Sequence, residues 1–478
     1  MNSVPASRST AENITLERHD SALHRGLSLR HILFIALGSA IGTGLFYGSA
    51  SAIQLAGPSV LLAYLIGGAA VFMVMRAMGE MALAHPVAGA FSEYATRYLG
   101  PWAGFVTGWT YAFEMALVAV ADVTAFAVYM QFWLPNSPAW LWIVLVLLII
   151  ITINLVHVKA FGESEFWFTM IKVLAIIAMI VGGAVLLLLN MNSADSPASV
   201  TNLWDEGGFF SNGFGGFLAC FTVVMFAFGG IETIGVAAGE ADNPRVSIPK
   251  AINTTPVRIL LFYVLTLTII MSLTPWSGIN GDTSPFVQIF ENLGIPAAAH
   301  VLNFVVITAA VSAINADVYG AGRMLYGLAA QKMAPASFMK TDRRGAPYMT
   351  VVCMAVVLVV GVIVNYLFED AFLVIASLAT FATVMVWVMI LWANIGFKKA
   401  MARQGQKIEF ETPGGMAGTV IALIFMLAIL VQFAFFPDTR LALVVGAVWC
   451  LIMAALYFGV TRKKLHEAPA QREDEALR

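Results

Sequence analysis

Long apolar stretches separated by short polar connections run along nearly the whole chain. Each stretch is long enough for a membrane-spanning α-helix of about 20 residues, and none shows the short apolar–polar alternation of a membrane β-barrel strand. The pattern therefore predicts an all-α polytopic membrane protein with 12 spans. The predicted spans are 29–56, 59–84, 101–134, 139–158, 163–190, 214–239, 256–276, 296–327, 347–367, 370–397, 416–436 and 440–461.

The composition agrees with this class. Hydrophobic residues make up 60% of the 478 residues and charged residues 11%, with a mean hydropathy of +0.83. Such a chain cannot cover an ordinary soluble domain with a solvated surface. The net charge of −2 gives no reason to expect a nucleic-acid partner. Because Cys220, Cys353 and Cys450 all lie within apolar runs, neither a disulfide framework nor a metal site is expected.

The positively charged residues indicate the orientation of the chain. With a cytoplasmic N-terminus, 24 of the 26 Lys and Arg residues fall in or beside cytoplasmic segments, and the exceptions are Arg440 and Lys172. This asymmetry follows the positive-inside rule and would be lost if one span were added or removed. Both termini are therefore predicted to be cytoplasmic. Residues 1–26 lack the apolar core of a signal peptide and are predicted to form a tail.

A glycine-rich run, Gly38-Ser-Ala-Ile-Gly42-Thr-Gly44-Leu-Phe46, interrupts the first span. Each glycine costs a helix roughly 1 kcal/mol relative to alanine and lets the backbone leave helical geometry. Non-helical backbone at membrane depth is tolerated where it is buried in protein or lines a polar cavity, so this run is a candidate substrate site. The alternative is close helix packing, since Gly38 with Gly42 and Gly44 with Gly48 are small-xxx-small pairs.

A second interruption lies in the sixth span, where Gly229 and Gly230 are followed by Glu232. The first and sixth spans each open a set of five helices, and two breaks at corresponding positions are typical of an inverted repeat. Exposed amides suit a carboxylate and exposed carbonyls suit an ammonium group, so a zwitterion fits between the two breaks. The predicted units are an N-terminal tail (1–26), a first repeat (27–190), a periplasmic loop (191–213), a second repeat (214–397), a cytoplasmic loop with two further helices (398–461) and a C-terminal tail (462–478).

Three long motifs carry a family resemblance: LSLRHILFIALGSAIGTGLFYGS, AGPSVLLAYLIGG and FAFGGIETIGVAAGEADNPRVSIPKAI. From about residue 25 to residue 461 the chain resembles bacterial amino acid permeases of the amino acid–polyamine–organocation superfamily. The third-span run TYAFEMALVAVADVTAF is most similar to permeases for proline, some of whose relatives carry histidine. The resemblance implies a leucine-transporter-type fold of two inverted five-helix repeats, with helices 1 and 6 broken, plus two extra helices. It also implies proton-coupled import across the inner membrane.

The same resemblance assigns residues to the site. The segment matching the carboxylate-binding part of the first helix is Ser39, Ala40, Ile41, Gly42, Thr43 and Gly44. The segment matching the part of the sixth helix that receives the amino group is Phe226, Ala227, Phe228 and Gly229. Either Phe226 or Phe228 would act as an aromatic gate.

Lys172 stands about three turns into the fifth span, too deep to reach the interface easily. Burial disfavours the charged form of lysine, so Lys172 is a candidate for losing and regaining a proton during transport. In proton-coupled members of the superfamily that the chain resembles, a lysine at a similar place occupies the site where sodium-coupled relatives bind their cation. The alternative is a structural cation that donates hydrogen bonds to carbonyls of the broken first helix.

Several acidic residues also lie within spans. Glu114 and Asp122 are eight residues apart and share one helical face. Glu114 is a candidate partner for an imidazole or a second amino-acid donor, or else a protonated acid between helices, while Asp122 is a candidate for proton coupling. Glu232 resembles a family position linked to substrate or proton binding. Glu240 is expected to brace a gate with Lys or Arg, and Asp317 to serve at an inner gate or in packing.

These features predict a proton-coupled symporter for an L-amino acid, with histidine or proline favoured, that works by alternating access. The alternatives are an amino acid exchanger, a permease for another neutral, aromatic or GABA-like substrate, and, more remotely, a channel. The sequence contains no nucleotide-binding glycine loop, zinc-protease helix or serine nucleophile elbow, so neither an enzyme nor a cofactor is expected. The expected partners are the L-amino acid, protons and the lipid bilayer, and the oligomeric state is open.

Overall fold

The computed structural model describes residues 27–39, 41–87, 89–156, 158–189, 198–281, 283–341, 347–366, 371–462 and 465. The tail predicted at 1–26, nearly all of the tail at 462–478, residues 191–197 of the predicted periplasmic loop, and the predicted site residue Ala40 lie outside these ranges. Over the described residues the fold is helical, and the only β-type pairing is an isolated bridge between Leu27 and Ala241.

The longer helices follow the apolar runs of the sequence. Their bounds are α2 (Leu29–Ser39), α4 (Gly48–Ala56), α5 (Val60–Ala84), α6 (Ala90–Leu99), α7 (Pro101–Gln131), α8 (Ala139–Val156), α9 (Val158–Leu188), α10 (Gly213–Ala219), α11 (Phe221–Phe228), α13 (Pro244–Asn253), α15 (Thr266–Leu273), α16 (Pro285–Asn292), α17 (Pro296–Ala330), α18 (Tyr348–Tyr366), α19 (Ala371–Arg403), α20 (Gly415–Gln432) and α21 (Pro437–Leu456). Shorter segments are α3 (Thr43–Phe46), α12 (Thr233–Ala237), α14 (Thr255–Arg258), the 3₁₀ turn η3 (Ala238–Glu240) and the π-helix η4 (Ile259–Leu265).

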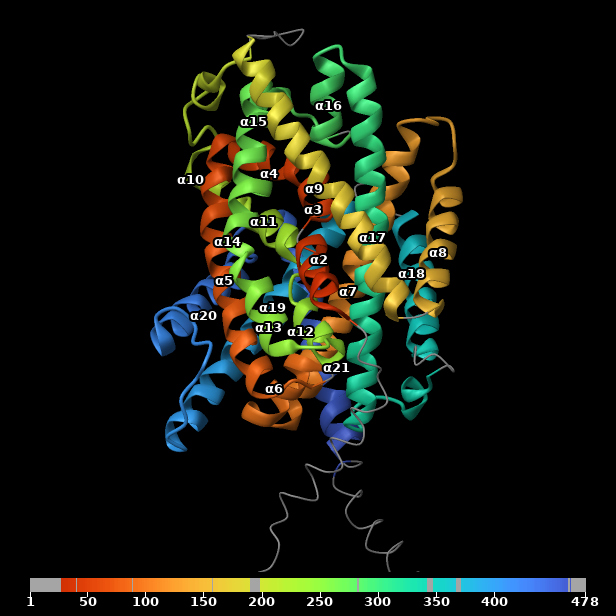
Figure 1. The fold of residues 1–478 in the computed structure, drawn as a ribbon, viewed down its shortest axis with the longest axis vertical. Helices are drawn as coiled ribbons and strands as arrows, with labels where there is room; N and C mark the ends of the chain where they lie inside the picture. Colours follow the sequence, from red (N-terminus) through yellow and green to blue (C-terminus); the bar gives the residue numbers. More distant parts are fainter. Residues whose placement is uncertain are drawn as a thin grey trace, which may run out of the picture.

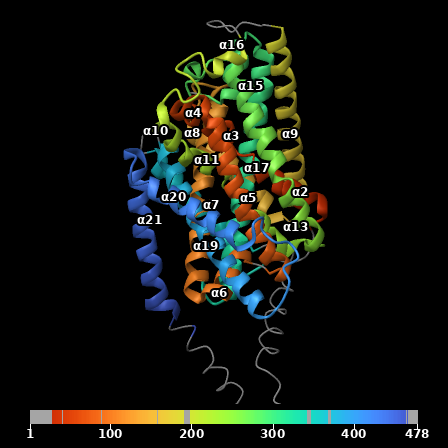
Figure 2. The same cartoon turned by 90° about the vertical axis from the view of Figure 1, so that its left-hand side faces the viewer.

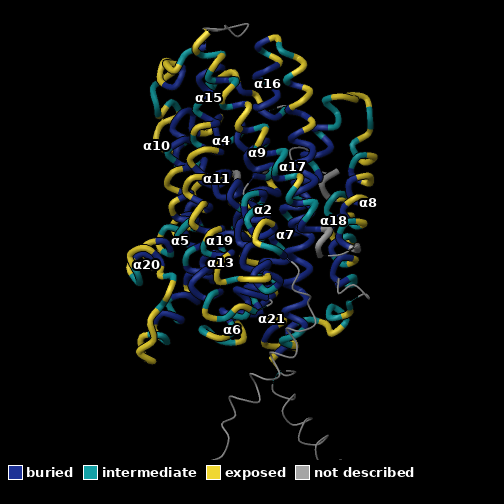
Figure 3. The backbone as a smooth tube through the Cα atoms, viewed as in Figure 1, coloured by how far each residue is buried: buried dark blue, intermediate teal, exposed yellow. Residues whose placement is uncertain are grey.

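Helices α7, α17 and α19 form the centre of the bundle, where α7 packs against both of the others (Figure 1). Helix α21 stands at the edge of the bundle (Figure 2). Exposed positions gather on the outer helices, including α8 and α20, whereas the interior is buried (Figure 3). The outward-facing residues of α20 and α21 are mainly Ile, Leu and Val, as expected for a surface that contacts lipid.

Within the described residues, ten helical stretches are long and apolar enough to cross a membrane. Two shorter apolar helices, Ala139–Asn154 and Tyr348–Ile363, coincide with the predicted fourth and ninth spans. The chain is therefore a multi-pass helical membrane protein. The 12-span count and the arrangement as two inverted repeats stay predictions.

Both predicted interruptions are present. Helix α2 ends at Ser39 and α3 begins at Thr43, with Gly42 between them in an extended conformation (φ −111°, ψ −162°). Helix α11 ends at Phe228 and α12 begins at Thr233, and Gly230 between them has a φ of +86°, a left-handed value that favours glycine. The glycines thus mark real ends of helices.

A wide turn lies beside the second break. In η4 the backbone adopts π geometry, which places an extra residue in the turn. The hydroxyl of Tyr263 in this turn donates a 2.8 Å hydrogen bond to the carbonyl oxygen of Ala227, near the end of α11. The π-helix therefore supports the end of α11 from the side.

Candidate substrate and proton site

A small polar cavity lies between the two helix breaks. The centre of a water-sized sphere has about 30 Å³ to move in, room for about two water molecules. Eight residues predicted for the site come together in its wall: Ser39, Gly42, Thr43, Gly44, Asp122, Phe226, Ala227 and Gly229. The wall is completed by Val118, Gly230, Ala313, Ala316 and Asp317.

The first break contributes backbone groups to this wall. The amides of Thr43 and Gly44 open α3, where an α-helix has no carbonyl partner of its own for its first N–H groups. Gly44 also sets the distance between the two broken helices, because a Cβ on Gly44 would lie 2.5 Å from the Cα of Ala227. At Gly42 a Cβ would meet only Ala313 Cβ, at an ordinary 3.6 Å. Ser39 instead turns its hydroxyl back to the carbonyl of Ile35 at 2.8 Å.

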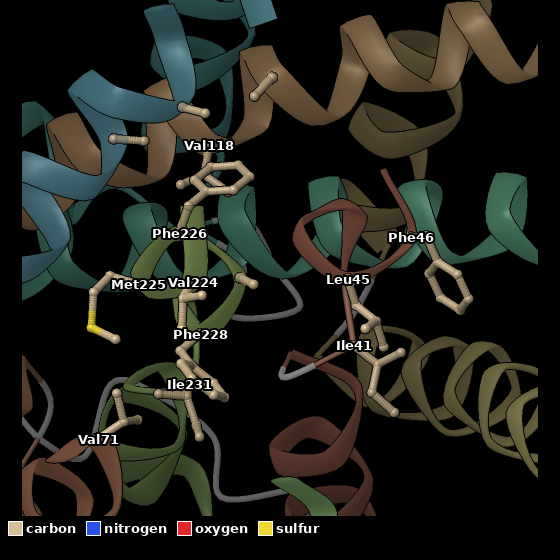
Figure 4. Close-up of a cluster of buried hydrophobic side chains, with 14 of the residues drawn as sticks. Ile41, Leu45, Phe46, Val71, Val118, Val224, Met225, Phe226, Phe228 and Ile231 are labelled. Atoms are coloured by element: carbon tan, nitrogen blue, oxygen red, sulfur yellow. The ribbon is translucent and has the colours of Figure 1, made fainter. Parts of the chain in front are cut away.

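The two phenylalanines of the second break lie in different places. Phe226 lines the cavity beside Val118, whereas Phe228 points toward another part of the core (Figure 4). The Phe228 ring is fully buried and packs on Tyr64 and Tyr263, with ring centroids 5.8 and 4.9 Å apart. Of the two residues predicted as a gate, Phe226 is therefore the one beside the cavity.

The buried acids form two neighbouring pairs. Asp122 accepts a hydrogen bond from the hydroxyl of Thr43, and its carboxyl group is within hydrogen-bonding reach of Asp317 on α17. Likewise, the carboxyl group of Glu114 is within hydrogen-bonding reach of that of Glu232. Two carboxylates at such a distance repel each other unless they share a proton or a cation lies between them. Both pairs are thus suited to hold a proton.

Glu232 is hydrogen-bonded to the backbone of the second break. Its carboxylate accepts hydrogen bonds from the amide of Gly230 at 3.3 Å and from the indole of Trp387 at 3.1 Å. In contrast, neither carboxyl oxygen of Glu114 makes a geometrically regular hydrogen bond to any described residue. Glu114 therefore makes fewer hydrogen bonds than Glu232 and can accept one from a further donor.

Lys172 on α9 joins three helices. Its ammonium group donates hydrogen bonds to the carbonyl oxygen of Gly38 at 2.9 Å, in the last turn of α2, and to that of Ile41 at 3.0 Å, within the first break. A third bond, of 3.0 Å, goes to the hydroxyl of Ser312 on α17. This geometry is the one expected for a cation that binds carbonyls of the broken helix. It is equally compatible with a group that releases a proton, because losing the proton would weaken all three bonds.

Glu165, also fully buried on α9, is a site residue that was not predicted from the sequence. Ser312 donates a 2.6 Å hydrogen bond to Glu165, so the acid is linked to Lys172 through one hydroxyl. A signal was available, since an acid within a predicted membrane span is costly in a bilayer. It was obscured because Glu165 lies only two residues inside the start of the predicted span, where polar residues are common.

Glu240 has the basic partner expected of it. Its carboxylate accepts hydrogen bonds from the hydroxyl of Tyr319 at 2.7 Å and from Arg323 at 3.2 Å. The guanidinium of Arg323 lies over the Tyr319 ring, 4.0 Å from its centroid, and Phe161 stacks on the other face at 3.9 Å. The backbone of Glu240 also accepts a bond from the amide of Leu27, directly before α2. We call Glu240, Tyr319, Arg323 and Phe161 the latch.

The fold and this cavity define a multi-pass helical membrane protein with a polar site where two broken helices meet. The sequence model of the family described as "Amino acid permease" matches residues 31–468. The chain therefore belongs to the amino acid permease family.

Its relatives are similar over nearly their full length. The chain is 43% identical to the "Uncharacterized amino acid permease YtnA" of Bacillus subtilis (strain 168), covering 96% of this chain and 100% of that protein. It is 46% identical to the "Aromatic amino acid transport protein AroP" of Escherichia coli O6:H1, covering 92% of this chain and 96% of that protein. The AroP protein of Salmonella typhimurium (strain LT2) matches to the same extent. These names do not support the preference for proline or histidine.

Proposed function

We propose that this permease is a proton-coupled symporter that imports an L-amino acid across the bacterial inner membrane by alternating access. The observation that carries the proposal is Lys172, whose three hydrogen bonds connect α9 to α17, to the end of α2 and to Ile41 within the first helix break. In this proposal the two shorter apolar helices complete 12 spans, with two inverted repeats of five helices and both termini in the cytoplasm.

Proton coupling follows from what these bonds require. Protonated Lys172 donates to the carbonyl oxygens of Gly38 and Ile41 at the broken end of α2, the first of which also accepts a 3.1 Å bond from the amide of Ile41, and so stabilises α2 against α9. A neutral Lys172 has two N–H donors in place of three and makes weaker hydrogen bonds. The end of α2 is then held less firmly and becomes free to rotate. A proton bound at Lys172 therefore favours one arrangement of the bundle over the other, which is the requirement for coupling its movement to that of the substrate.

The substrate lies in the cavity between the breaks. Its carboxylate accepts hydrogen bonds from the amides at the start of α3, at Thr43 and Gly44, and its ammonium group faces the carbonyls at the end of α11. Phe226 covers the bound side chain as a gate, and the latch closes the cytoplasmic side. Asp122 and Glu232 serve as secondary proton sites.

For the side chain we propose an aromatic amino acid. The aromatic transport proteins at 46% identity support this choice, as does the apolar part of the cavity wall formed by Val118, Ala313, Ala316 and Phe226. Histidine is the second candidate, because Glu114 has no regular hydrogen-bond partner among the described residues and could accept one from an imidazole. Proline has only the sequence resemblance in its favour.

Uptake into proteoliposomes tests substrate and coupling together. Labelled phenylalanine, histidine and proline are each offered with and without an inward proton gradient, and each of the standard amino acids is added as a competitor. We expect phenylalanine to be accumulated only with the gradient and to be competed by tyrosine and tryptophan. Uptake that is indifferent to the gradient but requires internal amino acid would identify an exchanger, and flux without saturation would identify a channel.

A further inference from the structure

A line of hydrogen bonds leads from Lys172 to Glu165, a buried acid that the proposed function has not used. Nζ of Lys172 donates to Oγ of Ser312 at 3.0 Å, and Oγ of Ser312 donates to Oε1 of Glu165 at 2.6 Å. All three side chains are fully buried. A hydroxyl has a single hydrogen, and that of Ser312 already points from the lysine toward the acid.

Among the residues that the structure describes, Ser312 is the only hydrogen-bonded neighbour of Lys172 that can pass a proton on. Among the described residues, the other two bonds of Lys172 end on the backbone carbonyls of Gly38 and Ile41, which carry no hydrogen to relay. Asp122 on α7 faces the lysine and Asp317 on α17 faces Glu165, but neither is hydrogen-bonded to Lys172. Thr169 is hydrogen-bonded to Glu165 at 3.3 Å and not to the lysine.

Glu165 also lies on the side from which a proton can leave. It precedes Lys172 by seven residues, about 10 Å along α9 toward the end of the helix that the proposed topology assigns to the cytoplasm. Two residues earlier, about 3 Å further along the axis, the side chain of Glu163 is 43% exposed and pairs with Arg30. One carboxyl oxygen of Glu165, Oε2, has no hydrogen-bond partner among the described residues.

We infer that Glu165 is the proton acceptor of Lys172 and that Ser312 is the relay between them. In this step an N–H bond of Lys172 breaks and its proton binds Oγ of Ser312, while the hydrogen of Ser312 passes to Oε1 of Glu165. The products are a neutral amine, an unchanged serine hydroxyl and a neutral carboxylic acid, so one proton has moved and charge is conserved. The reverse transfer recharges the lysine.

This inference rests on the proposed proton coupling, and matched variants test it. Ser312→Ala removes the relay, whereas Ser312→Thr keeps a hydroxyl at the same position. Glu165→Gln removes the acceptor but retains its shape, and Glu165→Asp retains the acid. Each variant is reconstituted in liposomes and assayed with labelled phenylalanine in two ways: uptake driven by an inward proton gradient, and exchange against internal phenylalanine at equal pH. Exchange needs no net release of a proton and reports whether the binding site is intact.

We expect Ser312→Ala and Glu165→Gln to lose at least about tenfold in gradient-driven uptake while exchange stays within about twofold, and the two conservative variants to retain both activities. Gradient-driven uptake preserved in Glu165→Gln would overturn the relay. So would an equal loss of uptake and exchange in both non-conservative variants, which would indicate a structural role. A wild-type protein without any response to the gradient would overturn the proposed coupling itself, a result distinct from these.

Discussion

The ammonium of Lys172 lies 2.9 Å from the carbonyl oxygen of Gly38, at the last turn of α2. Gly38 has no side chain to keep the two helices apart, and the space that a Cβ would occupy is filled by Thr169 and Glu165 of α9. The broken helix and α9 are thus in direct contact at the level of the break. A change in the charge of Lys172 acts immediately on the backbone of α2.

Replacing Lys172 by alanine should abolish proton entry driven by the amino acid, because the variant loses the ammonium group that holds the carbonyls of Gly38 and Ile41. The measurement is acidification of the lumen of proteoliposomes on addition of substrate. Lys398→Ala is a matched control, since Lys398 is also a buried lysine, 2.9 Å from Glu80, but outside the cavity. It should lower stability by about 3 kcal/mol and leave coupling intact. Unchanged acidification in Lys172→Ala would contradict the proposed role.

Alanine should have opposite effects at two glycines of the first break. At Gly44 its Cβ would lie 2.5 Å from the Cα of Ala227, so α3 and α11 must separate, which typically costs about 1–3 kcal/mol. At Gly42 the contact with Ala313 would be an ordinary 3.6 Å. We therefore expect Gly44→Ala to lose uptake of every substrate and Gly42→Ala to insert normally and retain transport. The check is uptake per amount of protein in the membrane, and equal behaviour of the two variants would count against the geometry.

Removing the charge of the latch should destabilise the protein far more than removing a surface charge. Glu240 and Arg323 have side-chain exposures of only 3% and 5%, and breaking such a pair by Glu240→Gln leaves a buried guanidinium without its anion, at about 3–5 kcal/mol. Arg30→Gln removes the exposed pair with Glu163 and should cost less than about 1 kcal/mol. Unfolding by denaturant in mixed micelles compares the two variants, and similar midpoints would be inconsistent with a closed latch.

Stability should fall in mild acid because of His85, which follows the last residue of α5. Burial, reinforced by nearby Arg97, lowers the pKa of His85 from 6.5 to about 4. Between these values the unfolded chain binds more protons than the folded one, so the free energy of unfolding decreases as the pH drops through this window. His85→Gln should therefore flatten the pH dependence of the unfolding temperature between about pH 6.5 and 4. Parallel profiles for the variant and the wild type would refute this contribution.

The two helix breaks were predictable because glycine lowers helix stability through its own backbone freedom, which does not depend on the neighbouring residues. The start of the helical segment that contains the predicted seventh span could not be predicted in this way. The predicted span is 256–276, but helical structure begins at Pro244, because the residues of α13 are too polar to be recognised as part of a span. Hydropathy finds the most apolar part of a helix and does not detect a more polar extension at its end.

The choice between Phe226 and Phe228 also required the structure. Residues two apart on a helix point to nearly opposite sides, so which ring meets the cavity depends on the rotation of α11. That rotation is fixed by contacts of Phe228 with Tyr64 and Tyr263, from two other helices. Likewise, Ser312 lies 147 positions from Glu165 in the sequence, and only the packing of α17 on α9 brings the two together.

The π-helix at Ile259–Leu265 makes the membrane core sensitive to chain length as well as to side chains. A turn of this kind accommodates one residue more than α geometry allows, and Tyr263 reaches the carbonyl of Ala227 only from that turn. Deleting a single apolar residue here would leave hydropathy and span length nearly unchanged, yet it would rotate the tyrosine by about 100° away from α11. Related chains that differ by one residue in this segment should therefore hold their second helix break by other means.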